Sequence, residues 1–362
     1  MICVMNLIEQ PNGWPVGDLQ AVPQCPVCDA TQRCAWRTGL TDKLFSAAPG
    51  RWTLWLCANC GCAYLDPRPT PQSIGRAYGT YYTHASEPGR HFVVPGDQPE
   101  LRAKRAVHAS YYNRRLGHSL APALPLGWML IGASRRRRAR AGQSIRHLAA
   151  PARRGSVLLD VGCGDGTFMR VARALGYVSR GIELDPAAAA VARQAGFEVD
   201  IRSIDAVEIA ANSIDQVTMN HVIEHLHDPI AALRRILAWL RPGGRIWLQT
   251  PNIDGQGASQ FGADWRGLEP PRHMVLFNPA SLQRALRAAG YDAVDLLPPP
   301  PDASFYIAQS QALRDSRDPY VDVGPRARRA AKRLGEQWNR MALREPESAE
   351  SVTLVGFKPG HV

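Results

Sequence analysis

The segment Val157–Pro186 restricts the fold of this chain more than any other part of the sequence. It contains an apolar stretch at Val157–Val161, a glycine-rich turn at Gly162–Gly166, a helical pattern and a second apolar stretch that ends at Glu183. This order predicts a βαβ unit with a nucleotide-type pocket at its first turn. Glycines let the backbone approach a ligand closely and direct amide groups at it.

The spacing of the glycines and acids distinguishes between nucleotide ligands. A dinucleotide fingerprint, G-x-G-x-x-G, needs a third glycine where this chain has Thr167. The chain instead reads D-x-G-x-G-x-G, with Asp160 two residues before the first glycine. Asp160 suits the ammonium group of an amino acid, and Glu183 suits the hydroxyls of a ribose. S-adenosylmethionine carries both groups, whereas glycines kept only for close packing would not require the two acids. The predicted cofactor-binding residues are therefore Asp160, Gly162, Gly164, Gly166 and Glu183.

Further apolar stretches extend the βαβ unit into a sheet, because helices between the early strands make right-handed crossovers onto parallel neighbours. Roughly 54 residues separate the last two predicted strands and include a basic helical pattern at Arg326–Met341. This insertion, about 298–350, is long for a connection between strands and is a candidate cap on the substrate side. The predicted strands are 157–161, 178–183, 197–201, 214–219, 244–250, 291–297 and 352–358.

Two C-x-x-C knuckles, Cys25–Cys28 and Cys57–Cys60, lie near the N-terminus. They are separated by 28 residues, more than the roughly 15–20 of a compact zinc ribbon, but Arg51–Leu56 reads as a strand that leads into the second knuckle. Four thiolates suit tetrahedral zinc in a closed structural site. Unliganded thiols are the alternative, and Cys34 and Cys62 are spare thiols in the same region. The predicted zinc ligands are Cys25, Cys28, Cys57 and Cys60.

Composition and the N-terminal sequence predict a cytoplasmic globular protein. Of the 362 residues, 45% are hydrophobic and 21% charged, which is enough apolar material for a sizeable core. The N-terminus lacks the basic and apolar regions of an export signal, and no stretch approaches the ~18 apolar residues of a membrane span. In the cytoplasm, paired cysteines bind metal more often than they form disulfides.

The net charge of +11 is partly concentrated in the arginine run Ser134–Arg140 and in a second basic patch at Arg326–Arg333. The apolar, tryptophan-bearing segment Leu124–Ile131 directly precedes the first run. One interpretation is a solvated helix face. A second is nucleic-acid binding, which is disfavoured because aromatic interleaving and a recognised nucleic-acid module are missing. A third is peripheral contact of this segment with an anionic membrane.

Residues 156–297 resemble class I S-adenosylmethionine-dependent methyltransferases. The likeness is greatest to the branch with ubiquinone-pathway O-methyltransferases and bacterial small-molecule and sugar methyltransferases. The resemblance implies a Rossmann-like, doubly wound α/β fold with a seven-stranded sheet whose last strand is antiparallel. Similar cysteine knuckles precede the catalytic domain in some members, including sugar C-methyltransferases. The matching segments are LLDVGCGDGTF, GIELDP, SIDQVTMNHVIEHLHDP, LRPGGRIWLQTPN and WRGLEPPRHMVLFNPASL.

Together these features predict three regions. Residues 1–66 form a small zinc-ribbon-like module, and residues 67–150 form a helical lid or linker with the basic segment. Residues 151–362 form the methyltransferase domain, with its insertion near the C-terminal end. In the family pattern, Ser203 and Ile204 flank the adenine, and Asn220 leaves the fourth strand beside the sulfonium.

The string His221–His225, H-x-x-E-H, follows that fourth strand. It matches an inverted zinc-protease signature, which requires a helix and a third ligand, so the end of a strand is the wrong setting. The resemblance implies another role, because ubiquinone-pathway O-methyltransferases bind a divalent cation there through E-x-x-E-H. This chain has His221 in place of the first glutamate. Metal assistance by Glu224 and His225, and simple hydrogen-bonded support of the strand end, both remain open.

The block Asp264–His273 follows the fifth strand and faces the substrate side in the family. Methyl transfer requires alignment of the acceptor and removal of its proton. His273 is the preferred base, because imidazole titrates near neutrality, and Glu269 and Arg272 are candidates to hold or polarise the acceptor. A structural alternative is that His273 caps the helix predicted at 279–290 or stabilises the loop. The predicted catalytic residues are His273, His221 and Glu224.

The sequence therefore predicts a methyltransferase for a small-molecule, sugar or lipid-linked acceptor, with oxygen as the methylated atom. RNA methylation is the alternative suggested by the charge and the knuckles, but the fourth strand ends in Met219–Val222 without the Asn/Asp-Pro-Pro-Tyr tetrad. A non-catalytic S-adenosylmethionine-binding scaffold is a third possibility, since binding and turnover use different residues. The sequence does not indicate an acceptor or an oligomeric state.

Overall fold

The computed structural model describes residues 13–79, 99–321 and 324–360. Its contacts divide the chain into two compact units. Unit 1 comprises Met1–Tyr82, Asn220–Leu237 and Leu248–Gly356, and unit 2 comprises Thr83–Met219, Ala238–Trp247 and Phe357–Val362. The division into residues 1–66, 67–150 and 151–362 stays a prediction.

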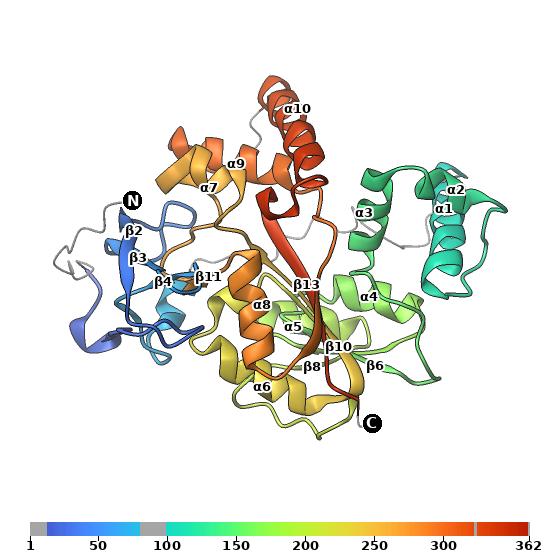
Figure 1. The fold of residues 1–362 in the computed structure, drawn as a ribbon, viewed down its shortest axis with the longest axis horizontal. Helices are drawn as coiled ribbons and strands as arrows, with labels where there is room; N and C mark the ends of the chain where they lie inside the picture. Colours follow the sequence, from blue (N-terminus) through green and yellow to red (C-terminus); the bar gives the residue numbers. More distant parts are fainter. Residues whose placement is uncertain (1–12, 80–98, 322–323, 361–362) are drawn as a thin grey trace. The chain divides into compact units, whose positions relative to one another are not determined.

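A seven-stranded sheet has the strand order β12-β13-β10-β9-β6-β7-β8 (Figure 1). β6 pairs in parallel with β7 and β9, and β7 pairs in parallel with β8. The sheet is mostly parallel with its last strands antiparallel, which confirms the predicted Rossmann-like α/β class. Its strands are β6 (Val157–Val161), β7 (Val178–Ile182), β8 (Glu198–Asp200), β9 (Ile214–Asn220), β10 (Leu240–Pro251), β12 (Asp292–Leu296) and β13 (Ser351–Phe357).

In unit 2, α4 (Thr167–Ala174) and α5 (Pro186–Gln194) follow β6 and β7. α5 begins where the Asp185 side chain accepts a hydrogen bond from the Ala187 amide, with proline at the first helical position. Its inner face is alanine, which lets it approach closely: a Cβ on Gly166 would lie only 3.1 Å from the Cβ of Ala192. Small residues on both sides thus hold the glycine turn against its neighbours.

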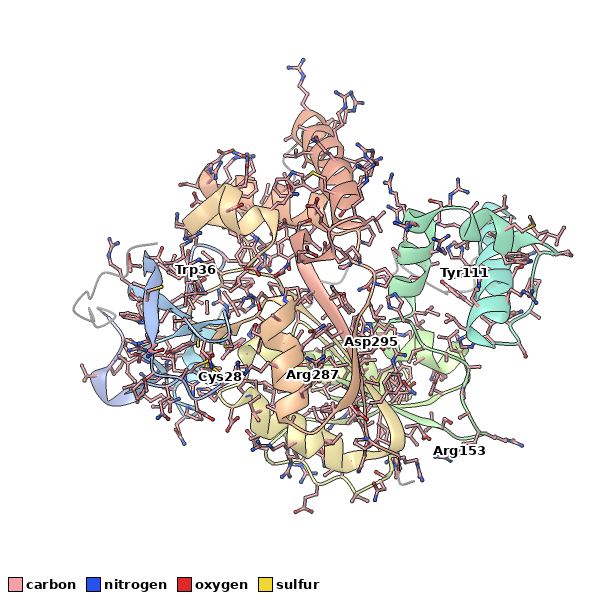
Figure 2. The ribbon with its side chains drawn as sticks, viewed as in Figure 1. Cys28, Trp36, Tyr111, Arg153, Arg287 and Asp295 are labelled. Atoms are coloured by element: carbon pink, nitrogen blue, oxygen red, sulfur yellow. The ribbon has the colours of Figure 1, made fainter. Side chains whose placement is uncertain are left out.

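Three helices precede the sheet in unit 2 and lie side by side in Figure 1: α1 (Pro99–Leu116), α2 (Gly127–Gly132) and α3 (Arg135–Ser144). Tyr111, labelled in Figure 2, and the fully buried Tyr112 fill the core between these helices with Ile131. The Tyr112 hydroxyl donates to the carbonyl of Ala141, 3.1 Å away. A buried tyrosine with a satisfied hydroxyl therefore links α1 to α3.

In unit 1, the cysteine-rich segment forms a sheet of order β11-β4-β3-β2. The predicted strand Arg51–Leu56 corresponds to β3, and Trp52 and Leu54 on it are almost fully buried. β11 follows the Asp264–His273 block and pairs antiparallel with β4, with Val275 opposite Tyr64. The N-terminal sheet thereby positions this block. The strands are β2 (Arg33–Leu40), β3 (Trp52–Cys57), β4 (Ala63–Leu65) and β11 (Val275–Leu276); β1 (Leu19–Gln20) pairs with β5 (Arg68–Pro69).

The predicted insertion folds as two helices of unit 1, α9 (Ala303–Arg314) and α10 (Gly324–Ala342), which pack together in Figure 1. The basic pattern at Arg326–Met341 lies within α10.

Among the described residues, no helix has the length and apolarity to span a bilayer. The other helices are α6 (Pro229–Trp239), α7 (Gln256–Phe261) and α8 (Pro279–Ala288), and the short 3-10 helices are η1 (Val16–Asp18), η2 (Ile74–Tyr78), η3 (Ile223–His225), η4 (Gly262–Asp264) and η5 (Pro346–Ser348).

Candidate active site

The glycine turn after β6 adopts backbone conformations that other residues rarely take. Gly162, Gly164 and Gly166 have φ values of +71°, +53° and +79°. The amides of Gly162 and Cys163 donate to the carbonyl of Ile182, at 2.8 and 3.1 Å, and so fix the turn to the end of β7. This is the local geometry that the D-x-G-x-G-x-G spacing predicts.

Glu183 follows β7 and lies beside this turn. Its Oε2 accepts from the Gly164 amide at 2.8 Å, and its Oε1 accepts from the Asp185 amide at 2.9 Å. Each carboxylate oxygen has a second lone pair, so the fixed carboxylate retains capacity for ligand hydroxyls. A contact between Glu183 and the ribose stays a prediction.

Asp160, at the end of β6, is almost fully buried and only partly satisfied. Its Oδ1 accepts from the Thr218 hydroxyl at 2.7 Å and forms an ion pair with Arg146. Its Oδ2 is shielded from solvent and has no hydrogen-bond partner among the described residues. Burial raises the pKa of Asp160, against the opposing effect of Arg146. A buried acceptor of this kind suits a ligand that brings its own donor, as the ammonium group of S-adenosylmethionine does.

Arg146 and Thr218 are site residues that the sequence does not predict. The sequence groups Arg146 with the basic surface residues, yet its guanidinium lies 3.7 Å from the ring centroid of Phe168 and 5.4 Å from that of Trp247. Its backbone has a φ of +48°, unusual for a residue with a side chain. Nothing in the spacing of the arginines distinguishes this buried one from its exposed neighbours.

The other predicted cofactor residues lie at strand ends. Ser203 begins a turn after β8, where its carbonyl accepts from the amides of Ala206 and Val207. Ile204 is buried, and Asn220 is the last residue of β9. Their contacts with the adenine and the sulfonium stay predictions.

In unit 1, His221 follows β9 with a φ of +54°. Its Nε2 lies 3.3 Å from the Gln249 amide nitrogen and its Nδ1 lies 3.3 Å from Glu224 Oε1. Because an amide nitrogen only donates, Nε2 accepts and Nδ1 carries the proton toward Glu224. The H-x-x-E-H string lies on a strand end and the short helix η3, which is not the α-helix of the protease signature.

Glu224 is fully buried and ionised. Burial alone would raise its pKa, but the hydrogen bond with His221 and the nearby His273 and His225 hold the pKa at about 2. The Thr250 hydroxyl donates to its Oε2 at 2.9 Å. The buried negative charge is therefore compensated on both oxygens.

His273 and Glu269 form a second buried pair in unit 1. His273 Nε2 lies 2.9 Å from Glu269 Oε2, and Arg266 Nη1 lies 3.0 Å from Glu269 Oε1. Burial would raise the pKa of Glu269, but Arg266 and the hydrogen-bonded neighbour His273 hold it well below its usual range. His273 Nδ1 lies 2.7 Å from the carbonyl of Gly267 and must donate to it. Any proton that His273 gains is therefore taken at Nε2, beside Glu269.

His225 completes this group. Its Nδ1 lies 3.1 Å from the Arg272 carbonyl and 3.2 Å from the hydroxyl of Tyr78, and its ring contacts His273 edge-on at 4.7 Å. Burial lowers the pKa of His225 to about 4, so the ring is neutral near pH 7. Tyr78 is not predictable as a site residue, because its sequence neighbourhood does not indicate a partner 147 positions away.

Two expectations about this block are wrong. Arg272 is a candidate acceptor contact in the sequence, but it is fully buried, and its guanidinium donates to both oxygens of Asp42, at 2.6 and 2.9 Å, and to the carbonyl of Ala77. It therefore anchors the block to the N-terminal segment. His273 also does not cap the next helix, because Asn278 caps α8 in a reciprocal pair with Ser281. Its contacts with Gly267 and Glu269 leave the alternative that it stabilises the loop open.

Glu224, His225 and His273 fit the divalent cation that the family resemblance implies. One ligand atom from each lies within 4.8 Å of the others. Both histidines direct Nδ1 at a backbone carbonyl, as metal-binding histidines commonly do. To bind a metal, Nε2 of His273 would have to exchange its contact with Glu269 for the ion. His273, rather than His221, provides the third donor of this group.

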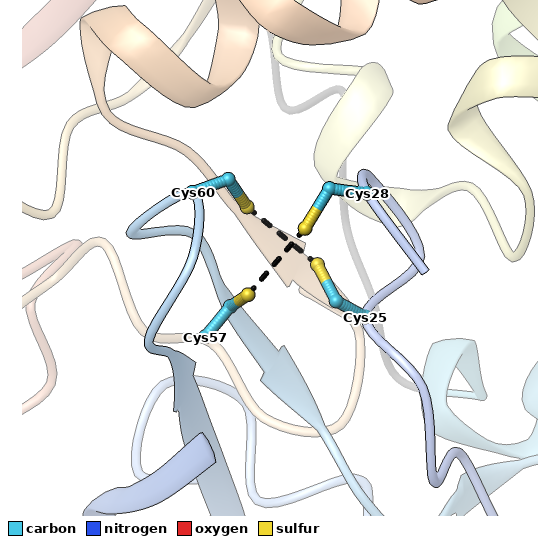
Figure 3. A group of neighbouring side chains, drawn as sticks. All are labelled: Cys25, Cys28, Cys57 and Cys60. Atoms are coloured by element: carbon cyan, nitrogen blue, oxygen red, sulfur yellow. Dashed lines mark hydrogen bonds between the residues drawn. The ribbon is translucent and has the colours of Figure 1, made fainter. Parts of the chain in front are cut away.

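The predicted zinc ligands converge in unit 1 (Figure 3). The sulfur of Cys25 lies 3.6 Å from that of Cys60, and the sulfur of Cys28 lies 3.6 Å from that of Cys57. A tetrahedral zinc with Zn–S bonds of ~2.3 Å separates its sulfurs by about 3.8 Å. The spare Cys62 is also close, with its sulfur 3.3 Å from that of Cys25. The four thiols lie within 4.8 Å of one another, which is compatible with a zinc site.

Comparison with known proteins agrees with this geometry. A family model described as "Methyltransferase domain" matches residues 133–296. The chain is 31% identical over 156 residues to the "Ubiquinone biosynthesis O-methyltransferase" of Aromatoleum aromaticum, covering 40% of this chain and 67% of that protein. It is 32% identical over 155 residues to the protein of that name from Xanthomonas euvesicatoria pv. vesicatoria, covering 39% of this chain and 65% of the relative.

The chain thus spans about two thirds of the length of these curated relatives. Among solved structures, the "putative methyltransferase" in a complex with the Haloferax volcanii Trm112 activator has a TM-score of 0.42 and 19% identity, covering 60% of this chain and 88% of that one. The sheet order, the glycine turn with its two acids and the matched relatives agree. The chain belongs to the class I S-adenosylmethionine-dependent methyltransferases.

Proposed function

We propose that this chain transfers the methyl group of S-adenosylmethionine to a hydroxyl oxygen of a small-molecule, sugar or lipid-linked acceptor. The observation that carries the cofactor assignment is the buried, unpartnered Oδ2 of Asp160 beside the Gly162–Gly166 turn. A carboxylate oxygen in that state needs a donor from a ligand. Oxygen as the methylated atom is supported by the relatives named O-methyltransferase.

His273 is the proposed base. With Nδ1 donating to Gly267, the lone pair lies on Nε2, and Glu269 is placed to stabilise the imidazolium that forms when Nε2 takes a proton. The Cys25, Cys28, Cys57 and Cys60 cluster holds a structural zinc in this proposal, which follows from the sulfur spacing. His221 and Glu224 support the site through their mutual hydrogen bond.

Substitution of Glu183 by alanine tests the cofactor site. Calorimetry should show that the wild type binds S-adenosylmethionine and S-adenosylhomocysteine and binds NAD far more weakly. Glu183→Ala should weaken binding of both adenosyl ligands by ~1–3 kcal/mol, because the ribose hydroxyls lose a charged acceptor. Glu198→Ala is the matched control, since this exposed acid on β8 pairs only with Arg180 among the described residues.

Tight NAD binding without S-adenosylmethionine binding would refute the cofactor assignment. A chain that binds S-adenosylmethionine but transfers no methyl group to hydroxylated small molecules or to RNA would support the scaffold alternative. If the chain methylates RNA but none of the small molecules, the acceptor is RNA and the proposal of a small-molecule acceptor is wrong.

A second proposal concerns the surface around α2 in unit 2, which we propose contacts an anionic bilayer. Leu126 is 68% exposed with a φ of +59°, and Leu130 is 53% exposed. Arg135 and Arg137 on the adjacent α3 are exposed as well. Exposed leucines combined with arginines suit the acyl and headgroup regions of an anionic membrane. For a cytoplasmic chain, this is the inner face of the membrane. The exposed apolar residues of this surface are Leu124, Leu126, Met129 and Leu130.

Vesicle co-sedimentation tests this surface. The wild type should sediment with phosphatidylglycerol vesicles and much less with phosphatidylcholine, and salt should weaken the binding. Replacing Leu126 and Leu130 together by serine should lower partitioning about tenfold or more, because two large apolar side chains no longer enter the bilayer. Val191→Ser, at an exposed position on α5, should bind as the wild type does. Binding to RNA in gel shifts without binding to vesicles would reassign the surface to nucleic acid, and binding to neither would return it to a solvated helix face.

A further inference from the structure

Asp302 occupies the N-cap position of α9 but does not cap the helix. An N-cap aspartate ordinarily accepts hydrogen bonds from the first helical amides. Here Oδ2 instead accepts from the Ser351 hydroxyl on β13, at 2.6 Å. The carboxylate is therefore directed toward β13 by a specific hydrogen bond.

The hydrogen bonds around Asp302 have a definite direction. Ser351 Oγ also lies 3.2 Å from the hydroxyl oxygen of Tyr306. Ser351 has one proton, which it donates to the carboxylate, so Tyr306 donates to Ser351. Burial raises the pKa of Tyr306 well above its ordinary value, which keeps this hydroxyl protonated. Tyr306 thus donates a hydrogen bond to Ser351, and Ser351 donates one to Oδ2 of Asp302.

The other oxygen of Asp302 is left without a donor. Oδ1 is shielded from solvent and has no partner among the described residues. The neighbouring Glu350 provides a contrast, because its Oε1 accepts from the Gly257 amide at 2.7 Å and its Oε2 accepts from the Trp265 indole at 3.3 Å. Glu350 therefore has the contacts of a structural acid, whereas Asp302 retains an unused acceptor.

Asp302 lies in the surroundings of His221. Burial raises the pKa of Asp302 to about 6, against the opposing effects of the Ser351 hydrogen bond, the nearby His221 and the backbone amide of Asp302. Gln249 bonds to His221 on one side, and its Oε1 accepts from Thr353 on the same strand as Ser351. Two residues of β13 thus face these groups: Ser351 bonds to Asp302, and Thr353 reaches His221 through Gln249.

We propose that Asp302 Oδ1 binds a hydroxyl group of the methyl acceptor and so selects hydroxylated acceptors over their ethers. The inference rests on the proposed methyltransferase function and deepens it by naming the acceptor-binding carboxylate. An ionised carboxylate oxygen only accepts hydrogen bonds, so the ligand must supply a donor, and the hydroxyl of the proposed acceptor is such a donor. Tyr306 and Ser351 are positioning residues, because they orient the carboxylate through Oδ2. An acceptor that presents a carboxylate or phosphate to Asp302 is disfavoured by like charge.

Ligand-observed NMR on the S-adenosylhomocysteine-saturated chain tests this assignment with two matched pairs of probes. Catechol is compared with 1,2-dimethoxybenzene, and glycerol with 1,2,3-trimethoxypropane, since methylation removes the hydroxyl donors of each pair and the Asp302 variants then separate the loss of a donor from the added bulk. The wild type should bind the hydroxylated member of one pair about tenfold or more tightly than the ether. Asp302→Ala should abolish this preference, and Glu350→Gln, at the satisfied acid, should preserve it.

Asp302→Asn is the second variant. Its melting temperature should equal or exceed that of the wild type without ligand, because an unpartnered buried charge is removed, while the hydroxyl preference falls. A lower melting temperature in Asp302→Asn with an unchanged preference would identify a structural carboxylate and overturn the proposal. The proposal is overturned equally if the wild type shows no hydroxyl preference, or if Asp302→Ala retains it. Calorimetry of S-adenosylmethionine with each variant separates these outcomes from failure of the cofactor site, which would abolish cofactor binding in the wild type as well.

Discussion

Replacing His273 by alanine is expected to slow methyl transfer by ~10²–10⁴-fold, the usual contribution of a positioned general base. The affinity for S-adenosylmethionine should change little, because the Asp160 and Glu183 carboxylates belong to a different part of the chain. The physical reason is the His273–Glu269 pair, in which Nε2 takes the proton and Glu269, 2.9 Å away, stabilises the resulting cation. Single-turnover transfer from radiolabelled S-adenosylmethionine to an acceptor identified by screening measures the rate.

His273→Asn is a second variant that distinguishes loss of the base from loss of folding. His273 is buried, and its removal leaves the Glu269 carboxylate with Arg266 as its nearest cation. Asparagine can still donate to the Gly267 carbonyl, but it cannot take a proton at neutral pH. It should therefore be nearly as slow as alanine while melting closer to the wild type. His108→Ala, on α1, is the matched control and should keep the full rate.

The same experiment separates the base from a metal ligand. If a divalent cation binds Glu224, His225 and His273, EDTA should abolish transfer in the wild type, and Glu224→Ala should be as inactive as His273→Ala. If His273 is the base, EDTA should leave the rate unchanged at concentrations at which elemental analysis still finds the zinc of the cysteine cluster. An acceptor with an acidic hydroxyl, such as a catechol, should reduce the loss in His273→Ala, because less proton removal is required of the protein. Full sensitivity to EDTA, with His273→Ala and Glu224→Ala equally inactive, would replace the base by the metal.

The elements around the cofactor turn were predictable because their signals are local. The apolar run Val157–Val161 matches β6 residue for residue, and the glycines that follow have the positive φ values that their spacing requires. The insertion was also recognisable, since the pattern at Arg326–Met341 is amphipathic over several turns and folds as α10. The positions of these strands and helices follow from periodic patterns within single segments of the sequence.

The unpredicted parts of the site depend on contacts between distant segments. Arg272 reads as a free cation in the sequence, but Asp42, 230 positions earlier, neutralises it. Tyr78 meets His225, 147 positions away in the sequence, through tertiary packing of unit 1. The buried role of Arg146 likewise follows from tertiary packing against Phe168. No pattern within one segment encodes these partners, which are determined by how strands and loops come together.

Serine in place of Cys28 or Cys60 is expected to remove the zinc and unfold the N-terminal sheet, the largest stability effect predicted for this chain. Structural zinc contributes ~10–16 kcal/mol to the folding of zinc-finger peptides, and a serine hydroxyl does not replace a thiolate as a ligand. Elemental analysis should give one zinc per wild-type chain and much less than one in either variant. Cys34→Ser, on β2, should keep the full metal content and melting temperature.

Cys62 makes the identity of the four ligands an experimental question. Its sulfur lies 3.3 Å from that of Cys25 and 3.5 Å from that of Cys60, so five thiols share the site. Two C-x-x-C knuckles with opposed pairs 3.6 Å apart favour Cys25, Cys28, Cys57 and Cys60. Cys62→Ser should therefore retain one zinc, with at most a modest loss of stability from the new buried hydroxyl. If Cys62→Ser loses the zinc while Cys28→Ser or Cys60→Ser keeps it, Cys62 is a ligand. The cysteine whose serine variant keeps the zinc is then not one.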